Sequence, residues 1–264
     1  MPAGKCSTWN TKTMNKIIAI ANQKGGVGKT TTAINLSASL AYKNKRILVI
    51  DFDPQGMATC GLGKTKEEKR GIYPALMNGH NLMDYVEPAE IENLYICPVS
   101  PELSGFEVEV FSLADRSKKL RPALNFVREY FDFIIIDCPP SLSFLTINAL
   151  TAADSILIPI QTEFFCLEGI PDLLRTLDDV RTYFNPSLSV EGILLTMYDE
   201  RTNLARQVAY EIHRSLKGII YEVIIPRTVK LAEAPSYGKP ALLYDIKSKG
   251  AQAYLNLAEE LLKK

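Results

Sequence analysis

The chain has few cysteines, no long hydrophobic run and no excess of charge of either sign. None of its five cysteines forms a C-x-x-C pair, which argues against a zinc site or a disulfide framework and is typical of reduced thiols in a cytoplasmic protein. No apolar stretch is long enough to span a membrane, and no signal peptide is visible. We therefore expect a cytoplasmic protein that has no stable association with a membrane.

The composition is that of one globular domain. Apolar residues make up 47% and charged residues 23% of the 264 residues, so a large core can form and disorder is not indicated. Residues 1–13 are polar and fit no core pattern. We expect them to form a flexible tail, or to lie upstream of an alternative start at Met14. Residues 14–264 are expected to form a single domain.

Apolar runs typical of buried strands alternate with helical patterns along the chain. The runs are continuous, as in parallel strands that are covered on both faces, and helical periodicity extends over Leu167–Tyr183 and Leu204–Lys217. This alternation predicts an α/β fold with a doubly wound, mostly parallel sheet and helices on both faces. A charged loop is expected at Gly61–Gly71 and a mobile stretch at Glu102–Ser117. The expected strands are Lys16–Ala21, Arg46–Asp51, Leu94–Pro98, Phe133–Asp137, Ser155–Ile160, Glu191–Met197 and Val223–Ile225.

The most informative segment, residues 23–32, reads QKGGVGKTTT and lies between a predicted strand and a helical stretch. This is the context of a phosphate-binding P-loop, in which glycines let backbone N–H groups turn toward a phosphate at a helix N-terminus. Lys29 is expected to reach the β- and γ-phosphates, and the Thr30 hydroxyl to bind Mg²⁺. The predicted nucleotide-binding residues here are Lys24, Gly25, Gly26, Val27, Gly28, Lys29, Thr30 and Thr31.

A second lysine, Lys24, lies close to Lys29 in this segment. Two such charges repel each other unless a polyanion is nearby. The pattern G-x-x-x-x-G-K-[ST] is complete except at its first glycine, where Gln23 stands. A lysine directly after that position is the mark of the deviant Walker A motif.

Carboxylates follow two other predicted strands. Residues 46–53, RILVIDFD, end in Asp51 and Asp53, and residues 131–141, FDFIIIDCPPS, place Asp137 at the end of an apolar run. Open α/β sheets bind their ligands at the carboxyl ends of the strands. Asp137 matches a Walker B aspartate, which holds Mg²⁺ through water. A helix cap or a turn is the alternative role for this residue.

The motifs KGGVGKTTT, DFDPQGMAT and DCPPS are followed by IIPRTVKLAEAPSYGKPALLYD at residues 224–245. This ordered set resembles the ParA/Soj family of chromosome- and plasmid-partitioning ATPases, in the deviant Walker A (ParA/MinD) group of P-loop NTPases. The resemblance extends from about Met14 to the end of the chain. It implies an ATPase that uses ATP and Mg²⁺, is weak alone, and is stimulated by a ParB-like centromere-binding partner.

The resemblance also implies roles for individual residues. Asp53 would orient or activate the attacking water and Asp51 would act near the metal, although either could instead only close the strand end. Lys24 would cross an isologous dimer interface and contact the partner's phosphates, so that hydrolysis depends on an ATP-dependent homodimer. The catalytic residues are therefore expected to be Lys24, Lys29 and Asp53, and the metal-binding residues Thr30, Asp51 and Asp137.

The resemblance places base and DNA contacts in the last third of the chain. Met197 and Pro226 would flank the adenine, although a proline could simply end a strand here. Residues 201–264 contain 11 lysines and arginines and 6 aspartates and glutamates, a net charge of +5 in a chain whose total is zero. ParA-like proteins bind DNA without sequence preference, and such phosphate contacts are steeply salt-dependent. A nucleoid-associated protein is therefore expected, with Arg201, Arg227 and Lys230 as the DNA-binding residues.

A MinD-like, membrane-associated ATPase that positions cell division or other cargo is the alternative. That group ends in a basic amphipathic helix, whereas Glu259 and Glu260 near this C-terminus would oppose binding to anionic lipid. We expect the last helix to pack on the core instead. An iron–sulfur reductase would need a second cysteine in the right context besides Cys138, and a substrate kinase would need an acceptor site that is not obvious. The apolar face of the last helix contains Tyr254, Leu257, Ala258 and Leu261.

Overall fold

The strands form one sheet at the centre of the molecule. The computed structural model describes residues 15–141, 143–163, 166–215 and 218–264, so the expected tail at residues 1–13 lies outside the described residues. Seven strands in the described part are ordered β3-β4-β2-β5-β1-β6-β7, and all neighbours are parallel except the edge pair β3–β4. The strands are β1 (Lys16–Ile20), β2 (Ile47–Asp51), β3 (Glu87–Pro88), β4 (Leu94–Cys97), β5 (Phe133–Asp137), β6 (Ser155–Gln161) and β7 (Ser189–Thr196).

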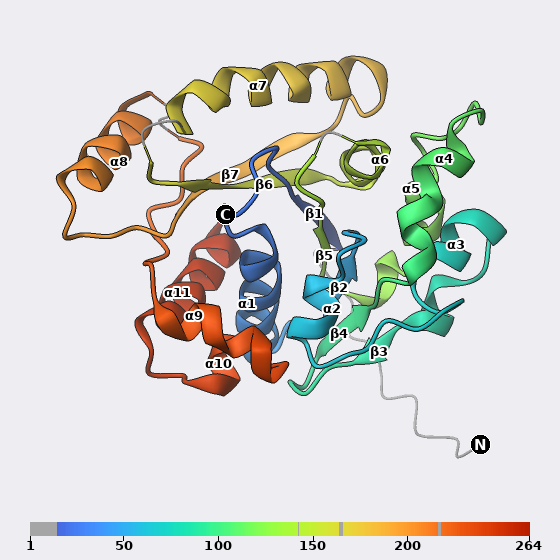
Figure 1. Ribbon diagram of the computed structural model, residues 1–264, viewed down its shortest axis with the longest axis horizontal. Helices are drawn as coiled ribbons and strands as arrows, with labels where there is room; N and C mark the ends of the chain where they lie inside the picture. The colour runs from blue at the N-terminus through green and yellow to red at the C-terminus, as the bar shows by residue number, and fades with distance from the viewer. Residues whose placement is uncertain (1–14, 142, 164–165, 216–217) are drawn as a thin grey trace.

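Helices cover both faces of this sheet (Figure 1), which confirms the doubly wound α/β fold predicted from the sequence. One face carries α1 (Lys29–Tyr42), α2 (Met57–Gly61), α9 (Val229–Glu233), η4 (Ala234–Tyr237), α10 (Ala241–Tyr244) and α11 (Lys249–Lys263). The other face carries α3 (Ile72–Asn78), η1 (Leu82–Tyr85), η2 (Pro101–Gly105), α4 (Phe106–Val110), α5 (Leu120–Asn125), η3 (Arg128–Tyr130), α6 (Phe144–Ala152), α7 (Cys166–Tyr183) and α8 (Asn203–Ser215).

The continuous apolar runs are explained by these two helical layers. In β5, Phe133 and Ile135 pack toward the α1 side, whereas Ile134 and Ile136 pack toward the α6 side. Successive side chains of a strand point to opposite faces, so a strand with helices on both faces needs an apolar residue at every position.

The C-terminal helix α11 packs on the core, as predicted. Tyr254, Leu257 and Leu261 are at most 2% exposed, and α11 lies beside α1 (Figure 1). Glu259 forms an ion pair of 2.6 Å with Lys43. No helix among the described residues is both long and apolar enough to cross a bilayer.

Three parts of the fold differ from the expectation. Val223–Ile225 is not a strand: only the flanking residues Ile220 and Pro226 form isolated bridges, to Ile193 in β7 and to Tyr198 just after it. Proline has no N–H with which to continue a ladder. The antiparallel strand β3 was not predicted, because its two residues carry no periodic pattern. Glu102–Ser117, expected to be a mobile stretch, contains most of η2 and all of α4, which bury Leu103 and Phe106 completely.

The strand order places the three segments that carry the predicted phosphate- and metal-binding residues side by side. Strands β2, β5 and β1 are neighbours, and their register aligns Asp51 with Asp137 and Asp137 with Ile20. The loop after β1 and the carboxylates of β2 and β5 therefore meet at one edge of the sheet.

Candidate active site

The loop between β1 and α1 has the backbone conformation of a phosphate cradle. Gly26 and Gly28 have positive φ angles of 74° and 88°, a left-handed conformation in which a side chain would be strained. The Thr196 hydroxyl, at the end of β7, donates a hydrogen bond of 2.8 Å to the Val27 carbonyl and fixes the loop to the sheet. Gly28 caps α1 without a side-chain hydrogen bond, so the N–H groups of the first turn are available to an anion.

The two lysines of this loop lie in different environments. Lys29 is buried, with 6% of its surface exposed, and its ammonium group donates to the Lys24 carbonyl at 3.1 Å. Burial lowers the pKa of Lys29, and the Asp137 carboxylate is the largest of the charges that oppose this shift. The Lys24 side chain is more exposed and forms an ion pair of 3.3 Å with Glu163, which follows β6. One lysine is therefore held inside the cradle, and the other is paired at its rim within its own chain.

Asp137 is a buried carboxylate at the end of β5. It is fully buried, and neither of its oxygens has a hydrogen-bond partner among the described residues. Burial, followed by repulsion from Asp51, raises the pKa of Asp137 well above its usual range. The nearby Thr30 hydroxyl and the Lys29 charge oppose this shift, although the Thr30 contact does not have the geometry of a hydrogen bond. An unpartnered buried charge is costly, so a cation bound here would be stabilising.

Asp51 is held very differently from Asp137. Its Oδ2 accepts hydrogen bonds from the N–H (2.7 Å) and the hydroxyl (2.6 Å) of Thr59 in α2, and its Oδ1 accepts one from the Asp53 N–H at 3.3 Å. Burial raises the pKa of Asp51 to about 6, against the effect of these hydrogen bonds. Both oxygens of Asp51 are thus engaged within the chain. Thr59 belongs to the DFDPQGMAT motif, but sequence reasoning gave it no role.

Two adjoining cavities lie over the loop. They share Gly28, Thr31 and Met197, so they form one continuous site with two compartments. The smaller, of about 280 Å³, is lined by Gly26, Gly28, Lys29, Thr30, Thr31, Asp53, Pro140 and Met197. The larger, of about 500 Å³, has a mostly apolar wall and includes Ile225, Pro226, Val229, Leu231 and Tyr254.

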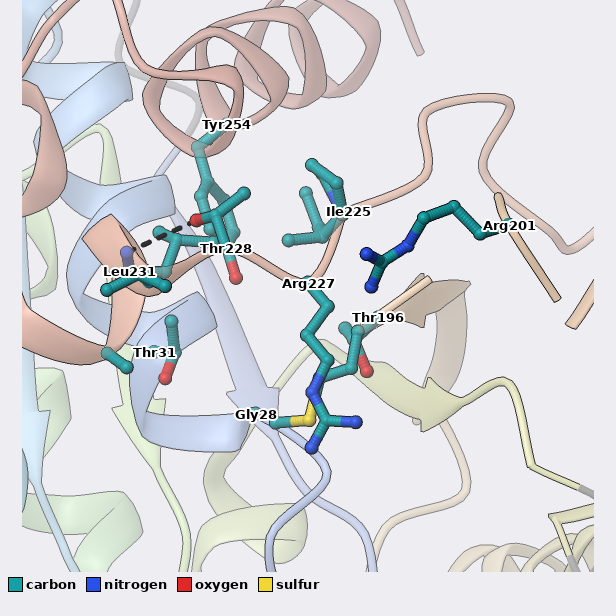
Figure 2. Close-up of a pocket in the computed structure, with 13 residues that line it drawn as sticks. Gly28, Thr31, Thr196, Arg201, Ile225, Arg227, Thr228, Leu231 and Tyr254 are labelled. Atoms are coloured by element: carbon teal, nitrogen blue, oxygen red, sulfur yellow. Dashed lines mark hydrogen bonds between the residues drawn. The ribbon is translucent and has the colours of Figure 1, made fainter. Parts of the chain in front are cut away.

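The larger compartment is built from segments that are distant in the sequence. Figure 2 shows Thr31 and Leu231 on one side of it, and Tyr254 entering from α11. Both residues predicted to flank a base, Met197 and Pro226, line this cavity. An apolar compartment beside a polar one is the arrangement that a nucleotide base and its phosphates require.

The three residues predicted to bind DNA are separated by the structure. Arg201 and Arg227 line the larger cavity (Figure 2), and Arg201 is paired with Asp199 at 2.7 Å. Lys230 is not among the residues that line this cavity. It lies 3.6 Å from Glu233 and 5.1 Å from the centre of the Tyr244 ring. Two of the predicted cations therefore lie at the nucleotide cavity, and the third lies outside it.

The fold and this site define a P-loop NTPase: a glycine loop leads into a helix, a lysine is buried in the loop, and carboxylates end the neighbouring strands. Residues 15–190 match the family model described as an AAA domain. The chromosome partitioning protein ParA of Myxococcus xanthus is 52% identical over 96% of this chain and 89% of that protein. The sporulation initiation inhibitor protein Soj of Bacillus subtilis is 50% identical over 94% of this chain and 98% of that protein.

A solved nucleotide-bound structure has the same fold as this chain. Cobyrinic acid a,c-diamide synthase from Mycobacterium smegmatis, with bound ADP and magnesium, superposes with a TM-score of 0.81 at 35% identity and covers 94% of each chain. The chain belongs to the ParA/Soj family of partitioning proteins, within the ParA/MinD type of P-loop ATPases. This confirms the family predicted from the four motifs.

Proposed function

We propose that the protein is an ATP-dependent switch that dimerises, binds DNA without sequence preference and hydrolyses ATP to segregate chromosomal or plasmid DNA. The observation that carries this proposal is the continuity of the two cavities over the glycine loop, which fits a base at one end and a triphosphate at the other. The name of the Myxococcus xanthus relative, a chromosome partitioning protein, supports DNA as the cargo.

The residues at the phosphate end fit a nucleotide-bound Mg²⁺ ion. No group of three or more His, Cys, Asp or Glu side chains in the described part of the chain could hold a metal. Mg²⁺ that arrives with a nucleotide needs only one or two protein ligands in addition to phosphate and water. Asp137, whose oxygens have no hydrogen-bond partner in the described part of the chain, and Thr30 beside it supply such ligands. Both oxygens of Asp51 already accept hydrogen bonds within the chain, so Asp51 stabilises the site without binding the ion directly. The ion would neutralise charge on the phosphates.

Hydrolysis depends on charge and position more than on covalent chemistry. Lys29 and the first turn of α1 hold the phosphates. Asp53 lines the phosphate compartment, and one of its oxygens accepts a hydrogen bond from the Gln55 N–H at 2.9 Å. Its other oxygen is left to orient the attacking water. Lys24 leaves Glu163 and crosses to the phosphates of a second protomer, where it supplies the charge that an arginine finger supplies elsewhere.

DNA binding is supported by the excess of basic residues in the C-terminal quarter of the chain, residues 201–264. Arg201, Arg227 and Lys230 contact phosphates, and the dimer doubles the number of these contacts. The ATP-bound dimer would associate with the nucleoid in the cytoplasm, and a ParB-like partner at a centromere site would stimulate hydrolysis and release it.

The direct test is binding to random-sequence duplex DNA, with ATP and with ADP, across a salt series. We expect binding with ATP that weakens steeply as salt increases, and weak binding with ADP. Absence of DNA binding in both states, together with ATP-dependent binding to anionic liposomes, would contradict this proposal in favour of a MinD-like membrane switch.

A further inference from the structure

Thr59 is a buried residue that contacts the site from outside the two cavities. It lies in α2, the short helix after β2, and its exposed fraction is 0%. We propose that Thr59 is a positioning residue for hydrolysis: it fixes Asp51 and, through Asp51, the backbone that carries Asp53. The inference rests on the ATPase activity proposed above and assigns part of it to a residue that does not touch the nucleotide.

A continuous set of hydrogen bonds leads from Thr59 to the phosphate compartment. Thr59 donates its N–H and its hydroxyl to one oxygen of Asp51, at 2.7 and 2.6 Å. The other oxygen of Asp51 accepts the Asp53 N–H at 3.3 Å. The Asp53 side chain in turn accepts the Gln55 N–H at 2.9 Å and lines the phosphate compartment. The position of the Asp53 carboxylate is therefore set by a carboxylate that Thr59 holds.

A third contact fixes the direction of the Thr59 hydroxyl. The Val99 N–H, just after β4, donates to Thr59 Oγ1 at 3.1 Å. A hydroxyl has one proton to donate. Because its oxygen accepts from Val99, that proton points to Asp51. Thr59 thus joins β2, α2 and the end of β4 in one orientation, the kind of support that holds a catalytic group within the small tolerance its chemistry allows.

This arrangement has a specific kinetic consequence. Asp53 is assigned to the attacking water, whereas Lys29 and the glycine loop hold ATP. Loss of the Thr59 hydroxyl should therefore impair the chemical step and leave nucleotide binding intact, which appears as a lower kcat at an unchanged KM.

The experiment compares Thr59→Val, which keeps the shape and removes the hydroxyl, with Thr59→Ser, which keeps the hydroxyl. The matched control is Thr151→Val, because Thr151 is also fully buried but its hydroxyl has no partner among the described residues. Steady-state ATP hydrolysis by the full chain is measured over a range of Mg²⁺–ATP concentrations, and thermal melting of each variant verifies folding. If Thr59→Val does not fold, Thr59→Ala takes its place.

We expect Thr59→Val to lower kcat about tenfold, the lower end of the roughly 10- to 100-fold loss caused by removing a hydrogen-bond partner that orients a residue at a metal site, with KM within about twofold of wild type. Thr59→Ser should recover most of the lost rate, and Thr151→Val should match wild type. An unchanged kcat in Thr59→Val, a raised KM at unchanged kcat, or an equal loss in Thr151→Val would overturn the inference. A wild-type protein that binds ATP without hydrolysing it would instead contradict the proposed function, and this inference with it.

Discussion

Replacing Glu163 by glutamine should strengthen ATP-dependent dimerisation. In the single chain, the Lys24 ammonium group is paired with Glu163 at 3.3 Å. If Lys24 must reach the phosphates of a second protomer, it first has to leave this carboxylate. Glu163→Gln removes the charge and keeps the size of the side chain, so it frees Lys24 without changing the P-loop.

The size of the effect follows from the exposure of the pair. The two side chains are 44% and 50% exposed, and exposed ion pairs are worth about 0.2–1 kcal/mol. A symmetric dimer breaks two such pairs, so the variant gains about 0.4–2 kcal/mol of association free energy. Because 1.4 kcal/mol corresponds to a factor of ten, the dimer should bind about 2- to 30-fold more tightly.

Sedimentation velocity with a nonhydrolysable ATP analogue measures this constant. A matched control is Glu90→Gln, which breaks a similar pair, with Lys239 at 3.2 Å and 42% and 57% exposed, away from the loop. The gain for Glu163→Gln should shrink at high salt, because exposed charges are screened there. Unchanged or weaker dimerisation of Glu163→Gln would refute the idea that this contact competes with the dimer.

Three further predictions concern buried and basic residues in and around the site. Asp51→Asn removes a carboxyl whose pKa is raised from 3.8 to about 6. Such a group stabilises the fold while protonated and loses that contribution as pH rises through 6, so the variant should gain roughly 2 kcal/mol relative to wild type between pH 4 and pH 7, measured by urea unfolding. Arg227→Ala should weaken both ATP and DNA binding, because Arg227 lines the nucleotide cavity. Lys230→Ala should weaken DNA binding alone and reduce the slope of the logarithm of DNA affinity against the logarithm of salt concentration by about 1. Calorimetry measures ATP binding, and fluorescence anisotropy measures DNA binding. Asn35→Ala leaves the buried Ala241 N–H, now bonded at 2.7 Å, without a partner and should cost about 1–3 kcal/mol in the same unfolding assay.

Sequence patterns identified the parts of the fold that local chemistry determines. Strands β1, β2 and β5 are continuous apolar runs; β1 leads into the glycine loop, and β2 and β5 end in aspartate. Their existence and their parallel arrangement were therefore both predictable. The segments that were predicted incorrectly lack such a local pattern. Strand β3 is two residues long, and Val223–Ile225 is an apolar run that follows the edge of the sheet without a regular ladder. Only the neighbours of such segments decide their structure.

The residues of the site likewise divide into those that local sequence patterns predict and those that they do not. The glycine loop, Lys29 and Asp137 were found because each lies at a fixed offset from a strand end. The contact of Lys24 with Glu163 joins residues 139 positions apart, and the contact of Arg227 with the nucleotide cavity depends on a segment that returns to the loop from the far end of the chain. No local pattern encodes either contact, so sequence reasoning assigned Lys24 to the nucleotide and to another protomer but gave it no partner within its own chain, and it gave Arg227 only a role on DNA.

The two-compartment cavity has a consequence for biosynthesis. Its phosphate end is lined mainly by residues 26–53, together with Pro140 and Met197, whereas its base end requires residues up to Tyr254. A growing polypeptide on the ribosome would carry a complete glycine loop long before it could enclose a base. Tight nucleotide binding would therefore begin only when synthesis is almost finished, and a nascent or truncated chain could not switch on prematurely.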